Sequence, residues 1–386
     1  MSDPWRERRV IGGATLYLGD ALEVVRALPD CSVHCCVTSP PYWGLRDYGT
    51  AKWEGGDPAC DHKQESPRER DFANRRGETK ANGFAGTSCT SWSTRDVTVK
   101  ARRNCRKCGA LRIDSQLGLE PTPQEYVEKM VAVFREVHRV LRDDGTIFLN
   151  LGDSYASGGR ATYRSGVSEN KGQDVQNDMP RPNTPSGLKP KDLCGTPWRV
   201  AFALQADGWY LRQDIIWSKP NPMPESVRDR CTKSHEYLFL LVKSERYYFD
   251  AEAITEESIY KAGEGGHQRF GAPGGKAEIE YGAQVSGEIW NSKGTRNKRS
   301  VWTIATAPFK GAHFATFPPK LIEPCILAGC PPGGFVLDPF AGSGTAGEVA
   351  LGLSRGFIGI ELSEIYFNDL FVPRIENAQR QMRMFA

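Results

Sequence analysis

Short apolar runs alternate with amphipathic segments along the chain, and this pattern predicts an α/β fold. A short apolar run bounded by turn residues is typical of a buried strand, and apolar residues every three or four positions are typical of a helix. Buried strands are predicted at residues 14–20, 33–37, 146–151, 210–218, 235–242, 301–304, 335–338 and 356–360. Helices are predicted at residues 21–28, 122–141, 197–206, 345–353 and 363–384, with another after Pro318.

Two junctions in this pattern carry more specific expectations. Gly145 is expected to close the helix at residues 122–141, because glycine is common just past a helix C-terminus. Residues 247–249 are expected to pair back on the strand at residues 235–242 as a hairpin.

Three polar, glycine-containing stretches interrupt the pattern, at residues 45–117, 157–192 and 256–300. The first has an excess of Lys and Arg. Such an excess is usually a solvated face, and it marks a DNA-binding surface only when the charges cluster on the folded protein. The second predicts a mobile loop, which at this length is usually functional or disordered.

The strand at residues 33–37 runs into the sequence Ser39-Pro40-Pro41-Tyr42-Trp43. Two consecutive prolines exclude both a helix and a sheet ladder, so the strand ends at Ser39. The carbonyl oxygens of Ser39 and Pro40 and the Ser39 hydroxyl then form a rigid row of acceptors beside two aromatic rings. This combination suits a planar group that carries an amine. The alternative is a plain Pro-Pro turn that closes a core strand.

Further along the chain, a strand, a glycine-rich turn, a helix and a second strand follow one another. The turn is Asp338-Pro339-Phe340-Ala341-Gly342-Ser343-Gly344, and the second strand ends in Glu361. Glycines let a ligand approach the backbone, and the helix N-terminus beyond them favours an anion. An acid at the end of the next strand is where nucleotide-binding α/β folds hold a ribose. The order of these features predicts a nucleotide-type ligand here.

Eleven cysteines in a sequence without a secretion signal predict a reducing environment, in which thiols are free or bind metal. Cys60-x-His62 and Cys105-x-x-Cys108 are two compact ligand pairs within the polar stretch 45–117. Four such ligands fit a tetrahedral structural zinc, which would order a segment that has no apolar core. Free surface cysteines are the alternative, and Cys89 is the substitute ligand if one of the four does not bind.

Two of these motifs together resemble the amino-methylating DNA methyltransferases that use S-adenosylmethionine. The catalytic motif of that family, Ser/Asn/Asp-Pro-Pro-Tyr/Phe, matches Ser39-Pro40-Pro41-Tyr42, and its cofactor motif, Phe-x-Gly-x-Gly, matches Phe340-Ala341-Gly342-Ser343-Gly344. Because the catalytic motif comes first, the chain is similar to the permuted β group of the family. The resemblance covers residues 15–45, 120–155, 195–255 and 300–375. It implies a Rossmann-like methyltransferase fold with a mixed, mostly parallel sheet, helices on both faces, a circularly permuted motif order and polar insertions.

The resemblance also implies roles for individual residues. Its catalytic residues are Ser39, Pro40, Pro41 and Tyr42. Its cofactor-binding residues are Asp20, Thr316, Phe317, Asp338, Phe340, Gly342, Gly344 and Glu361, and its substrate-binding residues are Trp43, Asp153, Lys219 and Asn221. Three of these positions have structural alternatives: Asp20 as a helix N-cap, Asp153 in an Asx turn and Trp43 as a core residue.

By the same resemblance the chain divides into one methyltransferase domain and two insertions. Residues 1–44 and 118–255 are expected to form the catalytic part of the domain, and residues 301–386 the cofactor-binding part. Residues 45–117 are expected to be a basic insertion with the zinc site, and residues 256–300 a target-recognition insertion.

The implied reaction is methyl transfer from S-adenosylmethionine to the exocyclic amine of a DNA base that has left the duplex and stacks on Tyr42. Family members with Ser at the first motif position mostly act on cytosine N4, and those with Asp on adenine N6. The resemblance therefore favours cytosine and leaves adenine as the alternative.

A methylase-like DNA-binding protein or an RNA-modifying enzyme is a different class of interpretation. The intact motifs argue against a protein that only binds, and Ser39 in place of Asn argues against the RNA-modifying relatives. A nicotinamide dehydrogenase could share the glycine-rich turn but would leave Ser-Pro-Pro-Tyr unexplained.

Composition adds little to this picture. The net charge is +3, from 50 Lys and Arg against 47 Asp and Glu, which is too small to indicate a nucleic-acid partner by itself. The sequence has no apolar run of about 18 residues and no secretory signal, which predicts a cytoplasmic protein with no membrane partner. The resemblance implies DNA as the partner and a bacterial or phage gene in a bacterial host. It leaves open whether a cognate restriction endonuclease exists and whether the protein is a homodimer.

Overall fold

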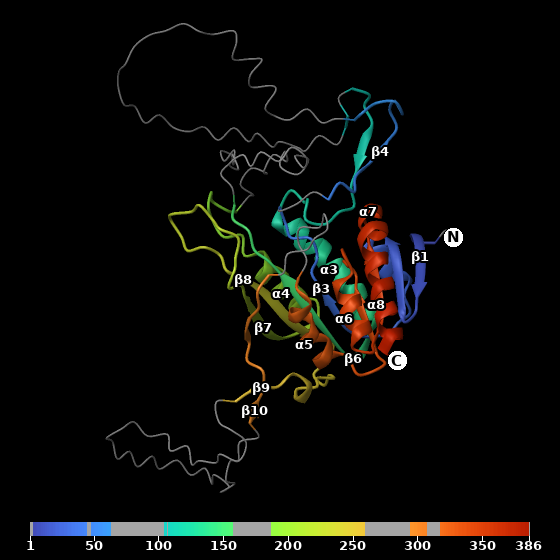
Figure 1. Ribbon diagram of the computed structural model, residues 1–386. Coiled ribbons are helices and arrows are strands. Elements are labelled where there is room, and N and C mark those ends of the chain that lie inside the picture. Colours follow the sequence, from blue (N-terminus) through green and yellow to red (C-terminus); the bar gives the residue numbers. More distant parts are fainter. Residues whose placement is uncertain are drawn as a thin grey trace, which may run out of the picture.

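A computed structural model describes residues 3–44, 48–62, 104–105, 107–156, 187–258, 294–306 and 317–385. In this part of the chain one nine-stranded sheet runs in the order β1-β2-β13-β12-β3-β6-β8-β7-β11 (Figure 1). Its strands are β1 Trp5–Ile11, β2 Ala14–Gly19, β3 Val33–Thr38, β6 Leu141–Leu151, β7 Tyr210–Ser218, β8 His235–Val242, β11 Val301–Thr303, β12 Phe335–Asp338 and β13 Gly356–Glu361. Two small ribbons pair β4 Lys52–Glu54 with β5 Leu111–Ile113, and β9 Glu256–Glu257 with β10 Thr295–Arg296.

The sheet is mixed but mostly parallel, as the sequence predicts. Strands β2, β13, β12, β3 and β6 pair in parallel with one another, and β7 pairs in parallel with β11. Antiparallel pairing joins β1 to β2 and places β8 between β6 and β7. The carboxyl ends of the five central parallel strands therefore meet at one edge of the sheet.

Helices cover both faces of this sheet (Figure 1). They are α1 Ala21–Ala27, α3 Pro123–Val140, α4 Thr196–Ala206, α5 Pro319–Gly329, α6 Thr345–Gly352, α7 Glu364–Tyr366 and α8 Val372–Phe385, with a short 3-10 turn η1 Glu252–Ile254 and a π-helical segment η2 Phe367–Phe371. Alternate residues of β3 enter two different cores: Cys35 and Val37 pack with α5, α6 and α8, and Val33 and Cys36 pack with α1, α3 and α4. A strand buried on both faces must be apolar throughout, which is why β3 reads as a continuous apolar run.

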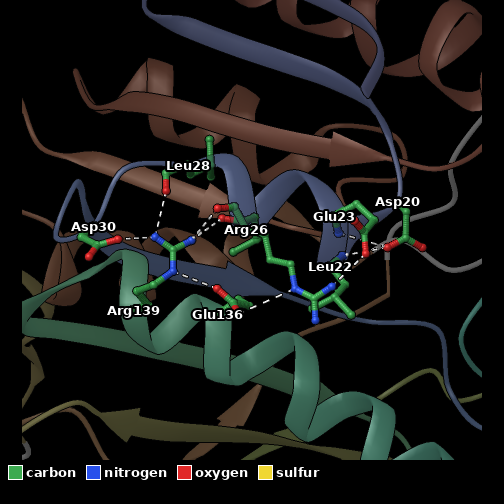
Figure 2. A network of polar contacts seen from close by, with 9 residues as sticks. Asp20, Leu22, Glu23, Arg26, Leu28, Asp30, Glu136 and Arg139 are labelled. Atoms are coloured by element: carbon green, nitrogen blue, oxygen red, sulfur yellow. Dashed lines mark hydrogen bonds and ion pairs between the residues drawn. The ribbon is translucent and has the colours of Figure 1, made fainter. Parts of the chain in front are cut away.

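Arg139 of α3 fixes the end of α1 (Figure 2). Its guanidinium donates to the backbone carbonyls of Val25, Arg26 and Leu28 at 2.9, 3.0 and 3.0 Å, and also bonds Glu136 and Asp30. The last carbonyls of a helix lack their usual partners four residues on, so this side chain supplies donors there, beside the Leu28 N–H that reaches the Val25 carbonyl. The other end of α1, which begins after Asp20, is thereby held in place on α3.

Two of the expected junctions are wrong. Strand β6 begins at Leu141, directly after α3, so Gly145 lies inside the strand instead of closing the helix. Residues 247–249 form no strand; the Tyr248 N–H donates to the Asp144 carbonyl at 2.9 Å, next to the start of β6. In both places tertiary pairing with the start of β6 overrides the local signal.

Most of the predicted loop at residues 157–192 and of the predicted insertion at residues 256–300 lies outside the described residues. Within the described ranges, no helix is long and apolar enough to cross a membrane.

Candidate active site

A cavity of about 320 Å³ opens at the carboxyl edge of the sheet. Gly19, which ends β2, and Asp20 after it line the cavity together with Ser39 and Pro41, which follow β3. The residues after β12 and the end of β13 contribute Phe340, Gly342 and Glu361. Ligands of open α/β sheets bind at this edge, because the loops that follow parallel strands converge there. The two sequence motifs, some 300 residues apart in the chain, thus share one cavity.

The glycine-rich turn is tied to Glu361 by hydrogen bonds. Gly342, at a φ of +54°, donates its N–H to Glu361 Oε2 at 2.9 Å, and the Ser363 N–H donates to Oε1 at 2.6 Å. Burial raises the pKa of Glu361 to about 7, although the hydrogen bonds from these two backbone N–H groups lower it. Gly344 does not line the cavity; it is the N-cap of α6, and a Cβ there would lie 2.5 Å from Phe371.

Asp338 lies beneath the cavity and does not line it. Its side chain is buried, and Oδ1 accepts both the Thr38 hydroxyl at 2.6 Å and the Phe340 N–H at 3.0 Å. Burial raises the pKa of this carboxyl to about 7. Asp338 therefore connects the end of β3 to the glycine-rich turn, which differs from the direct cofactor contact expected from the sequence.

Of three other predicted cofactor residues, the structure describes two. Asp20 lines the cavity and also caps α1, because Oδ1 accepts the N–H groups of Leu22 and Glu23 at 3.0 and 3.3 Å. The two roles considered for it are therefore compatible. Phe317 lines the cavity, and Thr316 lies outside the described residues.

Ser39 and Tyr42 converge on Asn150, near the end of β6. Asn150 donates its amide N–H to the Tyr237 carbonyl at 3.1 Å, which leaves Oδ1 facing the two hydroxyls. Ser39 Oγ lies 3.3 Å from Asn150 Oδ1 and 3.2 Å from the Tyr42 hydroxyl oxygen. A hydroxyl that donates its single proton to Asn150 keeps its lone pairs available to accept.

Glu236, which the sequence analysis missed, holds the Tyr42 hydroxyl. That hydroxyl lies 2.7 Å from Glu236 Oε2 and 3.0 Å from Asn150 Oδ1, and Lys219 forms an ion pair with the other oxygen of Glu236. Burial, followed by the neighbouring Glu236 charge, raises the pKa of Tyr42 well above its usual range. Tyr42 is thus a neutral donor. The Lys219 ammonium also lies 4.2 Å from the centre of the Trp217 ring.

The loop after the catalytic motif is anchored to the core. The Tyr126 hydroxyl donates to the Pro41 carbonyl at 2.9 Å, so this carbonyl has a partner within the protein. Trp43 is 4% exposed, and its indole N–H donates to the Glu120 carbonyl at 2.9 Å. These contacts fit the core alternative for Trp43 and not the substrate contact.

Two further predicted substrate residues make structural contacts. The Asp153 carboxylate accepts the N–H groups of Ser154, Gly195 and Thr196 at 2.9, 3.0 and 3.1 Å, which ties the end of β6 to the start of α4. The Asn221 side chain exchanges two hydrogen bonds with the Thr306 backbone. Neither residue lines the cavity. The Asp153 carboxylate thus accepts the first N–H groups of α4, which is a helix-capping contact and not the Asx turn considered as its alternative.

The four predicted metal ligands come together. The ligand atoms of Cys60, His62, Cys105 and Cys108 all lie within 4.8 Å of one another. Cys60 Sγ is 3.8 Å from Cys105 Sγ, and Cys108 Sγ is 3.4 Å from His62 Nδ1. The two sulfurs of a disulfide are about 2.05 Å apart. Two thiolates that bind one tetrahedral zinc, each with a Zn–S distance of about 2.3 Å, have sulfurs slightly less than ~4 Å apart. Cys89 lies outside the described residues.

Comparison with known proteins gives consistent matches over almost the whole chain. A family model described as DNA methylase matches residues 33–371. Type II methyltransferase M.Cfr9I of Citrobacter freundii is 43% identical over 366 residues, which cover 95% of this chain and 89% of that protein. Type II methyltransferase M.SmaI of Serratia marcescens is 42% identical over 351 residues, which cover 91% and 87%.

A solved structure supports the fold. The PvuII DNA methyltransferase, described as cytosine-N4-specific, superimposes with a TM-score of 0.51 at 16% identity, covering 98% of this chain and 96% of that chain. At this identity the likeness concerns the fold alone.

The fold and the shared cavity define an S-adenosylmethionine-dependent methyltransferase of the permuted α/β type. The family match is equally plain: the chain belongs to the DNA methylase family and is a DNA amino-methyltransferase.

Proposed function

We propose that this enzyme methylates cytosine N4 in DNA and that Ser39-Pro40-Pro41-Tyr42 presents the amine. The observation that carries the proposal is the shared cavity, which Ser39 and Pro41 line from one side and Gly342 and Glu361 from another. A hydroxyl, and not a carboxylate, stands at the first motif position. Adenine N6 presents a similar amine beside a ring nitrogen and is the competing outcome.

The cavity fits the cofactor in its donor set as well as in its position. S-adenosylmethionine, when bound, supplies a methyl group made electrophilic by its sulfonium. Glu361, whose two carboxylate oxygens already accept backbone N–H groups, has further lone pairs with which to accept the ribose hydroxyls. Phe340, Phe317 and Asp20 would form the remaining contacts, since all three line the cavity.

Ser39 and Pro40 would orient the amine. An exocyclic amine shares its lone pair with the ring and is a weak nucleophile. Acceptors at Ser39 Oγ and the Pro40 carbonyl would bind its two hydrogens and favour tetrahedral geometry, which returns the lone pair to nitrogen. The nitrogen would gain the methyl group as the methyl–sulfur bond breaks and leaves a neutral thioether, and the nitrogen would then release one proton to water. Holding the amine in line with the methyl group supplies much of the remaining rate enhancement.

Tyr42 would support the base by stacking. The target base must leave the duplex to reach the cavity. One side of the Tyr42 ring lies against the backbone of Gly152, where a Cβ would approach the ring to 2.5 Å. Backed in this way and held by Glu236, the ring offers a fixed surface to an incoming base.

Product analysis tests the base assignment. Duplexes with a single type of target base would be methylated with isotope-labelled cofactor, digested to nucleosides and analysed by mass. N4-methylcytosine supports the proposal. Labelled N6-methyladenine alone would overturn the base assignment, and label found only in RNA would overturn the substrate class.

We also infer that Cys60, His62, Cys105 and Cys108 bind one structural zinc ion. The support is the clustering of their ligand atoms within 4.8 Å. Residues 45–117 would then be an insertion around this ion, and residues 256–300 a target-recognition insertion. The relatives are named Type II methyltransferases, which supports a cognate restriction endonuclease as a partner.

A further inference from the structure

The ribbon formed by β4 and β5 connects the metal ligands to the cavity. Lys52, Trp53 and Glu54 pair with Ile113, Arg112 and Leu111, and the ribbon projects from the body that contains the large sheet (Figure 1). Two paired strands of three residues are marginally stable in water on their own. Contacts at the two ends of the ribbon must therefore keep it in place.

At its outer end the ribbon is built directly on the ligand cluster. The Trp53 ring stacks on the His62 ring with centroids 5.0 Å apart. The Cys105 N–H donates to the Ala110 carbonyl at 2.7 Å, just before β5. A Cβ on Gly56 would lie 2.7 Å from Cys108 Sγ, so the chain after β4 passes tightly over this ligand. A metal ion at the cluster would fix both strands at once.

At its inner end the ribbon becomes a wall of the cavity. Asp114 Oδ1, which follows β5, accepts the Thr50 hydroxyl at 2.9 Å and the Gln116 N–H at 3.1 Å. Gln116 Oε1 in turn accepts the Tyr48 N–H at 2.7 Å. Tyr48, Thr50 and Gln116 all line the cavity, as residues of the glycine-rich turn do. Tyr48 and Thr50 precede β4, and Gln116 follows β5. Their placement therefore depends on the pairing of β4 with β5.

The wall also reaches the cofactor side of the cavity. The Tyr48 ring meets the Tyr366 ring edge-on, with centroids 6.1 Å apart, and Tyr366 ends α7 shortly after Glu361. Residues from the inserted segment and residues from the proposed cofactor site thus touch across the cavity.

We propose that zinc binding by Cys60, His62, Cys105 and Cys108 sets the affinity for S-adenosylmethionine, by holding Tyr48, Thr50 and Gln116 in place as the outer wall of the cofactor cavity. The inference rests on the zinc ion and the cofactor site proposed above. Ordering a backbone costs conformational free energy, and a structural zinc ion supplies far more than the few residues of this wall require. Without zinc the wall is formed in only a fraction of the molecules. The apparent affinity for the cofactor is then the intrinsic affinity multiplied by that fraction.

The test measures zinc content and cofactor binding separately, without DNA. Full-length parent, Cys105→Ser and the control Cys231→Ser would be compared by elemental analysis, calorimetric titration with S-adenosylmethionine and far-UV circular dichroism. Cys231 is an exposed cysteine outside the cluster. We expect one zinc per chain in the parent and control, and in Cys105→Ser a loss of zinc with a cofactor Kd raised roughly ten-fold or more.

Two further samples keep the test decisive if Cys105→Ser folds poorly. Parent protein stripped with a chelator should lose affinity and regain it when zinc alone is added back. Thr50→Val should keep its zinc and still bind the cofactor several-fold more weakly, because it breaks the wall at the Asp114 contact.

The outcomes separate the inference from the proposals beneath it. Zinc lost with cofactor Kd unchanged overturns the coupling and leaves the zinc site standing. A parent protein that is purified without zinc overturns the zinc site itself, and the coupling with it. A methylated base other than cytosine affects neither result, because no DNA enters these measurements.

Discussion

The hydroxyl of Tyr42 lies 2.7 Å from Glu236 Oε2, and this contact joins the catalytic turn to the first residues of an antiparallel strand. Strand β8 runs against β6, so its beginning lies at the edge of the sheet where the parallel strands end. Glu236 forms an ion pair with Lys219, and an ionised carboxylate accepts a stronger hydrogen bond than a neutral group does. Glu236 is therefore a positioning residue for Tyr42.

Glu236→Gln should slow methyl transfer about ten-fold and leave cofactor binding unchanged. The amide keeps the shape but removes a charged hydrogen bond of about 1.5–3 kcal/mol, and Glu236 does not line the cavity. Single-turnover rates at saturating cofactor and DNA would measure this, with Glu245→Gln as the exposed control. If Glu236 acts through Tyr42, combining it with Tyr42→Phe should add little further loss. Additive effects would contradict the positioning role.

Tyr42→Ala and Tyr42→Phe should separate the ring from the hydroxyl. Alanine removes stacking worth about 1–3 kcal/mol, whereas phenylalanine keeps the ring and loses the hydroxyl contacts with Glu236, Asn150 and Ser39. We expect the phenylalanine variant to be the more active on a defined duplex, with both variants binding cofactor like the parent. Equal losses in the two variants would mean that the hydroxyl carries the role and not the ring.

Arg139→Ala should lower the free energy of unfolding by about 2 kcal/mol, because it removes the guanidinium hydrogen bonds to three carbonyls at the end of α1. Chemical denaturation would measure the change, and Arg246→Ala, at an exposed position, is the matched control. Since α1 begins at Asp20, the same variant should also weaken cofactor binding modestly. A stability equal to that of the control would show that water replaces the guanidinium without cost.

The central strands and both motifs follow from the sequence because each is a local signal. Strand β3 is apolar on both faces, and the prolines after it can neither donate nor continue the ladder. The glycines after β12 stand where a strand turns into a helix. Their meeting at one cavity follows from parallel pairing, which places the ends of β3 and β12 side by side.

What the sequence could not predict depends on contacts between distant segments. Glu236 looks like an ordinary polar residue at the start of an apolar strand until β8 is paired with β6. The β4–β5 ribbon has no periodicity to read, since three residues a strand are too few. The hydrogen bonds that the carboxylates of Asp338 and Asp153 accept from the protein itself also join segments that are distant in the sequence.

Asp338→Asn should change how stability depends on pH without disturbing the local structure. The Thr38 hydroxyl and the Phe340 N–H both donate to Oδ1, so an asparagine oxygen can accept both. The aspartate has a pKa near 7 in the folded protein, raised by burial from an ordinary value of 3.8. Between about pH 4 and 7 the folded state therefore binds the extra proton, and this group's contribution to stability decreases as pH rises through that window.

A neutral amide does not titrate, so Asp338→Asn should not lose stability at this position as the pH rises. The free energy of unfolding of Asp338→Asn minus that of the parent should be about 2–3 kcal/mol larger at pH 8 than at pH 5. Urea unfolding of the cofactor-free proteins at both pH values would measure it. Glu361, whose pKa is also raised to about 7, is present in both proteins and largely cancels. Asp369→Asn, at an exposed position, should show no such pH-dependent difference. If Asp338→Asn behaves like that control, the carboxyl under the cavity titrates normally, and burial does not hold it protonated.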